Sequence, residues 1–222
     1  MKKTRILLIH GAAVTSRIWA RMAGIFREYD YEVLAPDRES SGNMNREIQN
    51  LWDLADDSIV VGVSGGATLA WELAACGCPM KEVFAHEPAA GSLVPGLLAG
   101  PGSAFTNMTG SEPEKTIRDK AAFFGRTLYG PNWRTFYLPD DTRKVFRDYQ
   151  MFAAFEPHKP QIPVNRIHLT IGGASPQNRY DVAEQYAYAF RTQSYTILDA
   201  RHFLPVDCPK QYAEYILQKI GC

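Results

Sequence analysis

The sequence predicts an α/β protein in which a doubly wound, mostly parallel sheet of about six strands is flanked by helices and carries a helical cap insertion. Two observations support this prediction. Short, unbroken apolar segments alternate along the chain with segments of helical periodicity, as in a layered α/β domain. Several of these apolar segments also lack the alternation of apolar and polar residues that marks a strand with one solvent-exposed face. Their absence of alternation is typical of parallel strands buried on both faces.

Strand and helix pairs account for the first third of the chain. Residues 5–9 (RILLI) form an apolar run before a glycine turn, and Ile18 and Met22 follow at helical spacing within residues 16–29. The same alternation predicts strands at residues 31–36 and 58–63 and helices at residues 46–56 and 65–76.

The alternation is interrupted once. After a fourth strand, predicted at residues 80–88, no convincing strand occurs before residue 160, and only helical periodicity is visible, at residues 117–130 and 142–156. We therefore expect a core of residues 1–88 and 161–222 and a cap of residues 89–160. The cap is rich in aromatic residues, which suits a packed helical hairpin or an apolar pocket wall. Strands at 166–173 and 193–200 and helices at 180–190 and 208–220 complete the predicted core.

The composition favours a small-molecule ligand. Lys plus Arg and Asp plus Glu both number 24, so no whole-chain field attracts nucleic acid or an anionic membrane. The four cysteines lack the spacing of zinc ligands, and we expect no metal and no cofactor. The first apolar run is too short for a secretory signal and none is long enough to span a bilayer, so we expect a cytoplasmic protein. The sequence leaves a homodimer open.

The stretch VVGVSGGATLA contains a candidate nucleophile. Gly62, Ser64 and Gly66 satisfy the pattern G-x-S-x-G between an apolar strand and a helix, which is the context that this motif requires. Small residues two positions from the serine make room for a strained turn that exposes the hydroxyl at the start of the helix. The alternative is an ordinary glycine loop.

Four stretches together resemble the α/β-hydrolase family over nearly the whole chain: LLIHGAAVTSRIW, VVGVSGGATLA, VFAHEP and ILDARHFLPVDCP. The resemblance implies a triad of nucleophile, histidine and acid, with a cap inserted after the strand that carries VFAHE. It also implies that the chain begins at the family's third strand, without the first two strands of the fold.

Of the five histidines, His202 is the best candidate for the base that a serine nucleophile needs. It lies in a loop between a late strand and the last helix, and the resemblance gives the final histidine this role. His10 more naturally holds the His-Gly turn, His86 competes weakly, and His158 and His168 read as structural or exposed.

Two backbone amides are expected to bind the oxyanion: that of Gly65, directly after the serine, and that of Ala12, directly after His-Gly, with Ala13 as the alternative. The resemblance implies an Asp after the strand at 166–173, but Ser175 stands there. Candidate replacements are, in order, Glu87, Asp181 and Asp199.

The sequence therefore predicts a serine hydrolase, in which Ser64, His202 and Glu87 cleave a small, fairly apolar carboxylic ester, thioester or lactone through an acyl-enzyme. Alternatives are a cofactor-free lyase or oxygenase with the same residues, and a ligand-binding protein with a decayed triad. Near the predicted site, Asp37 and Arg38 are expected to close a loop by an ion pair, with contact to the substrate as the alternative. Trp133 and Tyr137 are expected to pack within the cap or face the pocket.

Overall fold

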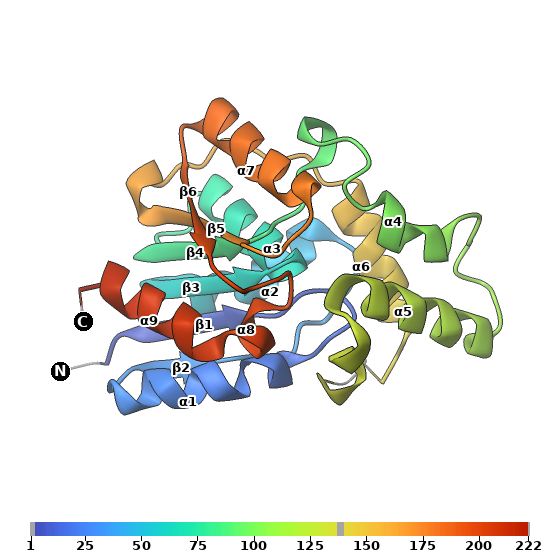
Figure 1. The fold of residues 1–222 in the computed structure, drawn as a ribbon, viewed down its shortest axis with the longest axis horizontal. Helices are drawn as coiled ribbons and strands as arrows, with labels where there is room; N and C mark the ends of the chain where they lie inside the picture. The colour runs from blue at the N-terminus through green and yellow to red at the C-terminus, as the bar shows by residue number, and fades with distance from the viewer. Residues whose placement is uncertain (1–2, 137–139, 222) are drawn as a thin grey trace.

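A computed structural model describes residues 3–136 and 140–221, which form one six-stranded parallel sheet in the order β2-β1-β3-β4-β5-β6 (Figure 1). The strands are β1 Arg5–Ile9, β2 Glu32–Leu34, β3 Ser58–Val63, β4 Glu82–His86, β5 Ile167–Gly172 and β6 Gln193–Ile197. The predicted fold class is confirmed. The sheet is parallel throughout, and β2 is shorter than predicted because it is a half-buried edge strand.

Helices cover both faces of the sheet. On one face α1 (Ala20–Glu28) packs against α9 (Pro209–Lys219), next to the short α8 (Leu204–Asp207). On the other, α2 (Met44–Ala55) packs against α3 (Gly65–Ala75), and α3 meets α7 (Gln177–Phe190) through the Trp71 and Tyr186 rings, whose centroids are 4.5 Å apart. All residues of β3 and α3 are buried, so the junction between them is held in the core.

The segment between β4 and β5 contains the short α4 (Ala99–Gly102), α5 (Glu114–Tyr129) and α6 (Arg143–Ala153), joined by turns. In Figure 1 these helices lie beyond the end of the sheet at which β3 meets α3. Trp133 is buried against Gly125 of α5 and so packs inside this segment, whereas Tyr137 lies outside the described residues. The helical insertion is present as expected.

None of the helices that the structure describes is both long enough and apolar enough to cross a lipid bilayer.

Candidate active site

Ser64 occupies a strained turn between β3 and α3. Its φ of 56° and ψ of −123° are unusual for a residue with a side chain, and its amide donates to the carbonyl oxygen of His86 at 2.9 Å. A Cβ at Gly66 would lie 2.0 Å from the Ile9 carbonyl oxygen, and a Cβ at Gly62 would lie 2.3 Å from the Gly66 carbonyl oxygen. Only glycine fits at either position, so the G-x-S-x-G spacing has a direct steric cause.

Glu87 and His202 form a buried pair. Glu87 directly follows β4, the neighbour of β3, and its Oε2 accepts from Nδ1 of His202 at 2.7 Å. Its Oε1 accepts from the Gly172 amide at 3.0 Å and from the Ser175 hydroxyl at 2.5 Å. Both carboxylate oxygens are therefore held by donors, and one of these donors is the serine that stands where the sequence pattern expects an Asp.

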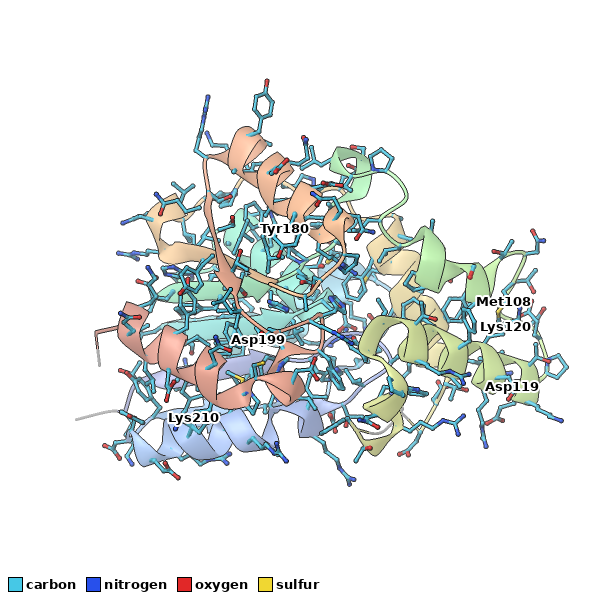
Figure 2. All side chains as sticks on the ribbon, in the orientation of Figure 1. Met108, Asp119, Lys120, Tyr180, Asp199 and Lys210 are labelled. Carbon is cyan, nitrogen blue, oxygen red and sulfur yellow. The ribbon has the colours of Figure 1, made fainter. Side chains whose placement is uncertain are left out.

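The other two candidate acids lie elsewhere. Asp181 accepts from the Gln177 side chain at the exposed start of α7, at 3.1 Å. Asp199 lies on the turn that follows β6, with a positive φ of 61° (Figure 2). Within the described ranges, Glu87 is the only carboxylate hydrogen-bonded to His202.

The environment of this pair keeps its histidine neutral and its carboxylate ionised. Burial and the nearby Arg179 guanidinium lower the pKa of His202 to about 4, although the hydrogen bond to Glu87 opposes this shift. Burial alone would raise the pKa of Glu87, but the neighbouring His86 and His202, with Arg179, hold it well below its usual value. A neutral His202 that donates from Nδ1 presents a lone pair at Nε2, and this buried nitrogen has no hydrogen-bond partner among the described residues.

Tyr129, the last residue of α5, joins the two halves of the site, and sequence reasoning missed it. Its ring stacks on His202, with centroids 5.6 Å apart and planes 18° apart. Its buried hydroxyl donates to the Ala12 carbonyl oxygen at 2.8 Å and also interacts with the Ser64 side chain. Burial raises the pKa of this phenol, so it stays protonated. No signal in the sequence separates Tyr129 from the other aromatic residues of the insertion.

The His-Gly turn that precedes Ala12 is fixed by a buried arginine. Arg38 donates from Nε to the His10 carbonyl oxygen at 3.0 Å and from Nη2 to that of Gly11 at 3.3 Å. His10 contributes as the sequence predicts, donating from Nδ1 to Gly11 at 2.8 Å and accepting the Arg38 amide on Nε2 at 3.0 Å. Burial, followed by Arg38, lowers the pKa of His10 to about 3, so both bonds involve a neutral ring.

The expected ion pair between Asp37 and Arg38 is wrong. The Arg38 side chain, which is fully buried, pairs instead with Glu47 of α2 at 3.1 Å and with Asp148 of α6 at 2.6 Å. Asp37 instead accepts the backbone amide of Ser16 at 2.7 Å, at the start of the short helical turn Ser16–Trp19 that follows the His-Gly turn. Because Asp148 belongs to the insertion, Arg38 ties the insertion to the His-Gly turn.

The two predicted oxyanion-binding residues face one small cavity. Ala12 and Gly65 line it together with Ser64, whereas Ala13 is not part of the lining. Within the described part of the chain, neither amide has a hydrogen-bond acceptor. The Phe152 ring covers Gly65 so closely that a Cβ there would lie 2.3 Å from it.

A second cavity adjoins the first. The cavity at Ser64 measures about 20 Å³, room for a single water molecule, and its neighbour measures about 230 Å³. Both are bordered by Ala89, Leu98, Tyr149 and Phe152, so these side chains separate them. The larger cavity is lined mainly by small and apolar residues between Ala89 and Ala99.

The remaining histidines have structural contacts. His86 is bonded to the Thr170 hydroxyl and the Arg201 carbonyl oxygen, at 3.0 and 3.1 Å. His158 and His168 pair with glutamates Glu72 and Glu82. In the parts of the chain that the structure describes, no group of three or more His, Cys, Asp or Glu side chains could hold a metal ion.

Comparison with known proteins agrees with this architecture. No curated protein is significantly similar to the chain in sequence. Among solved structures, the carboxylesterase CesB (YbfK) from Bacillus subtilis is 12% identical, with a TM-score of 0.62 over 99% of this chain and 84% of the esterase. The enol-lactonase from Burkholderia xenovorans LB400 is 11% identical, with a TM-score of 0.65 over 100% and 93%. MenH from S. aureus is 16% identical, with a TM-score of 0.70 over 99% and 94%.

At such identities the structural matches show the fold alone, but the sequence itself also matches a family model. The model described as "Alpha/beta hydrolase family" covers residues 6–215, nearly the whole chain. The strained serine turn, the parallel sheet and this match lead to one conclusion: the chain belongs to the alpha/beta hydrolase family.

Proposed function

We propose that this protein is a serine hydrolase that cleaves a small carboxylic ester, thioester or lactone through an acyl-enzyme. The observation that carries the proposal is the buried pair of Glu87 and His202, which shares a site with a serine on a strained turn. A neutral imidazole with its Nδ1 proton on a carboxylate and a free Nε2 is the form that acts as a general base.

In the proposed reaction, Nε2 of His202 takes the hydroxyl proton of Ser64 while Oγ bonds to the substrate carbonyl carbon. The Ala12 and Gly65 amides stabilise the negative oxygen, and Glu87 stabilises the imidazolium. Collapse of the tetrahedral intermediate breaks the bond to the leaving oxygen or sulfur, which receives the proton from His202. Water then attacks the acyl-enzyme by the same route, and the carboxylic acid leaves.

The cavities support a small substrate with an apolar part. The space at Ser64 holds only a water molecule, so a substrate must displace the side chains that separate it from the larger apolar cavity. Phe152 and Tyr149 come from the same helix, α6, and their movement would join the two spaces. Carboxylesterase and lactonase appear in the names of two structural neighbours, which adds to the support for ester chemistry.

Labelling with a fluorophosphonate probe tests the nucleophile. Wild-type protein should be labelled once, at Ser64, and should hydrolyse p-nitrophenyl acetate and butyrate. Ser64→Ala should lose both activities, whereas the control Ser194→Ala, at an exposed position on β6, should keep both.

Three results would contradict the proposal. Labelling of another residue would show that Ser64 is not the nucleophile. Absence of labelling would favour a ligand-binding protein. Labelling with no hydrolysis of any ester, and no uptake of oxygen from ¹⁸O-water into the product, would favour lyase-type chemistry with the same residues.

A further inference from the structure

Arg179 is a buried cation that the proposed mechanism does not use. It lies in the first turn of α7 and is 6% exposed. Its side chain lines the same cavity as Ser64, Gly65 and Ala12. Apart from Ser64, Glu87 and Arg179, the cavity is lined by alanine, glycine, leucine and aromatic side chains, so Arg179 supplies the positive charge there.

Its guanidinium has unused hydrogen-bonding capacity. The closest contact to an acid is from Nε to Oε2 of Glu87, at 3.5 Å, which is an ion pair but longer than a normal hydrogen bond. That carboxylate already receives hydrogen bonds from His202, Gly172 and Ser175. Among the described residues, none accepts a hydrogen bond from the Arg179 side chain, so its donors remain available beside Ser64.

The chemistry of this cation indicates a carboxylate ligand. A guanidinium presents paired N–H donors that match the two oxygens of a carboxylate, and a buried guanidinium without acceptors is costly. A phosphate dianion suits the site less well, because Glu87 is already ionised 3.5 Å from Arg179 and would repel the second charge.

We propose that the substrate carries a carboxylate, so that the enzyme acts on hemiesters or half-thioesters of dicarboxylic acids. Arg179 binds the free carboxylate, and the ester carbonyl lies between Ser64 and the amides of Ala12 and Gly65. This inference rests on the proposed function, and it refines the substrate class: the chain between the two carboxyl groups is apolar and contacts the apolar cavity wall.

The test compares charged and neutral esters of similar length. Ethyl hydrogen succinate, glutarate and adipate are compared with ethyl heptanoate by pH-stat titration of the acid released. For the best hemiester, wild-type kcat/KM should exceed that of ethyl heptanoate about tenfold or more, since a charged hydrogen bond is typically worth that factor. Arg179→Met should abolish this preference, and Arg179→Lys should retain part of it. The control Arg166→Met, at an exposed position before β5, should keep the full preference.

The ratio between substrates separates binding from structural effects. If wild type shows no preference for any hemiester, or if Arg179→Met lowers both rates in equal proportion, Arg179 is only a counter-ion of Glu87 and the inference is wrong.

Binding calorimetry with adipate and with the neutral hexanamide distinguishes this failure from failure of the proposed function. If wild type binds adipate, Arg179→Met does not, and the protein has no esterase activity, the carboxylate site is supported and the proposed hydrolase function is refuted. Adipate and hexanamide bound equally well, or neither bound, would reject the site whatever the activity.

Discussion

Replacing Glu87 with glutamine is expected to reduce kcat/KM about 10⁴-fold, because the amide would move the imidazole proton of His202 from Nδ1 to Nε2. Oε1 of Glu87 accepts from Gly172 and Ser175, and Oε2 accepts from Nδ1 of His202. Glutamine has one oxygen, and placing it toward Gly172 and Ser175 satisfies two donors. Its NH₂ group then donates to Nδ1, which moves the imidazole proton to Nε2, the atom that accepts the Ser64 proton in the proposed reaction.

The opposite orientation of the glutamine would set its NH₂ group against the Gly172 amide, donor against donor. The His202 tautomer with its proton on Nε2 is therefore the stable state of the variant. In a serine protease, the same carboxylate-to-amide change reduces kcat about 10⁴-fold through the wrong tautomer, or about 5.5 kcal/mol of transition-state stabilisation.

The assay measures kcat/KM on p-nitrophenyl acetate together with the rate of fluorophosphonate labelling, and thermal unfolding verifies that the variant is folded. Asp181→Asn and Asp199→Asn serve as matched controls, because they remove the other two candidate carboxylates and should stay within about twofold of wild type. Activity of Glu87→Gln within tenfold of wild type would refute the reasoning, as would an equal loss in either control.

Three further predictions concern the surroundings of the site. Tyr129→Phe should label about two- to tenfold faster with a fluorophosphonate, because the phenol no longer competes for the Ser64 hydroxyl; slower labelling would mean that the phenol assists the reaction. Because the pKa of His202 is lowered from 6.5 to about 4, kcat/KM should stay level down to about pH 5, and a midpoint near 6.5 would contradict this environment. Between pH 6.5 and 4 the unfolded chain binds a proton at this residue that the folded chain does not, so the contribution of His202 to folding stability should decrease as the pH is lowered, by about 1.4 kcal/mol per unit. Arg38→Met should lower the free energy of unfolding by about 3–5 kcal/mol in a denaturant titration, because it leaves two buried carboxylates unpaired. The control Arg118→Met, at an exposed ion pair, should change the free energy of unfolding by under about 1 kcal/mol. Equal effects of the two substitutions would show that the buried ion pairs of Arg38 stabilise the fold no more than an exposed pair does.

The sequence predicted those structural elements whose determinants all lie within one short stretch of the chain. The junction of β3 with α3 was predicted at the residue where it occurs, because a fully apolar run, two sterically required glycines and a small-residue helix all lie within one short stretch. The strand at 31–36 was overestimated, because an edge strand pairs on one side only and Glu32–Leu34 alone meets β1.

Contacts between distant residues could not be predicted in the same way. Tyr129 meets Ala12 across 117 positions and Arg38 meets Asp148 across 110, and neither pair shares a motif or a spacing. The acid is intermediate: Glu87 could be ranked first because β4 was expected beside β3, but its contact with His202 depends on the backbone at Glu87, where φ is 50°.

The position of the Glu87 carboxylate, directly after β4, has a consequence for how the proposed site can diverge. Among the described residues, the loop after β5 contributes one hydroxyl, that of Ser175, to the network around His202, and two residues later α7 begins, with Arg179 in its first turn. In the proposed site, mutations after Ser175 would therefore alter which molecule is accepted, while Glu87, at the end of β4 beside the central strand β3, keeps its place. In the proposed site, substrate choice and proton transfer would be separately adjustable, so directed changes of specificity are best sought between Pro176 and Arg179, which leaves the hydrogen bond from Ser175 to Glu87 intact.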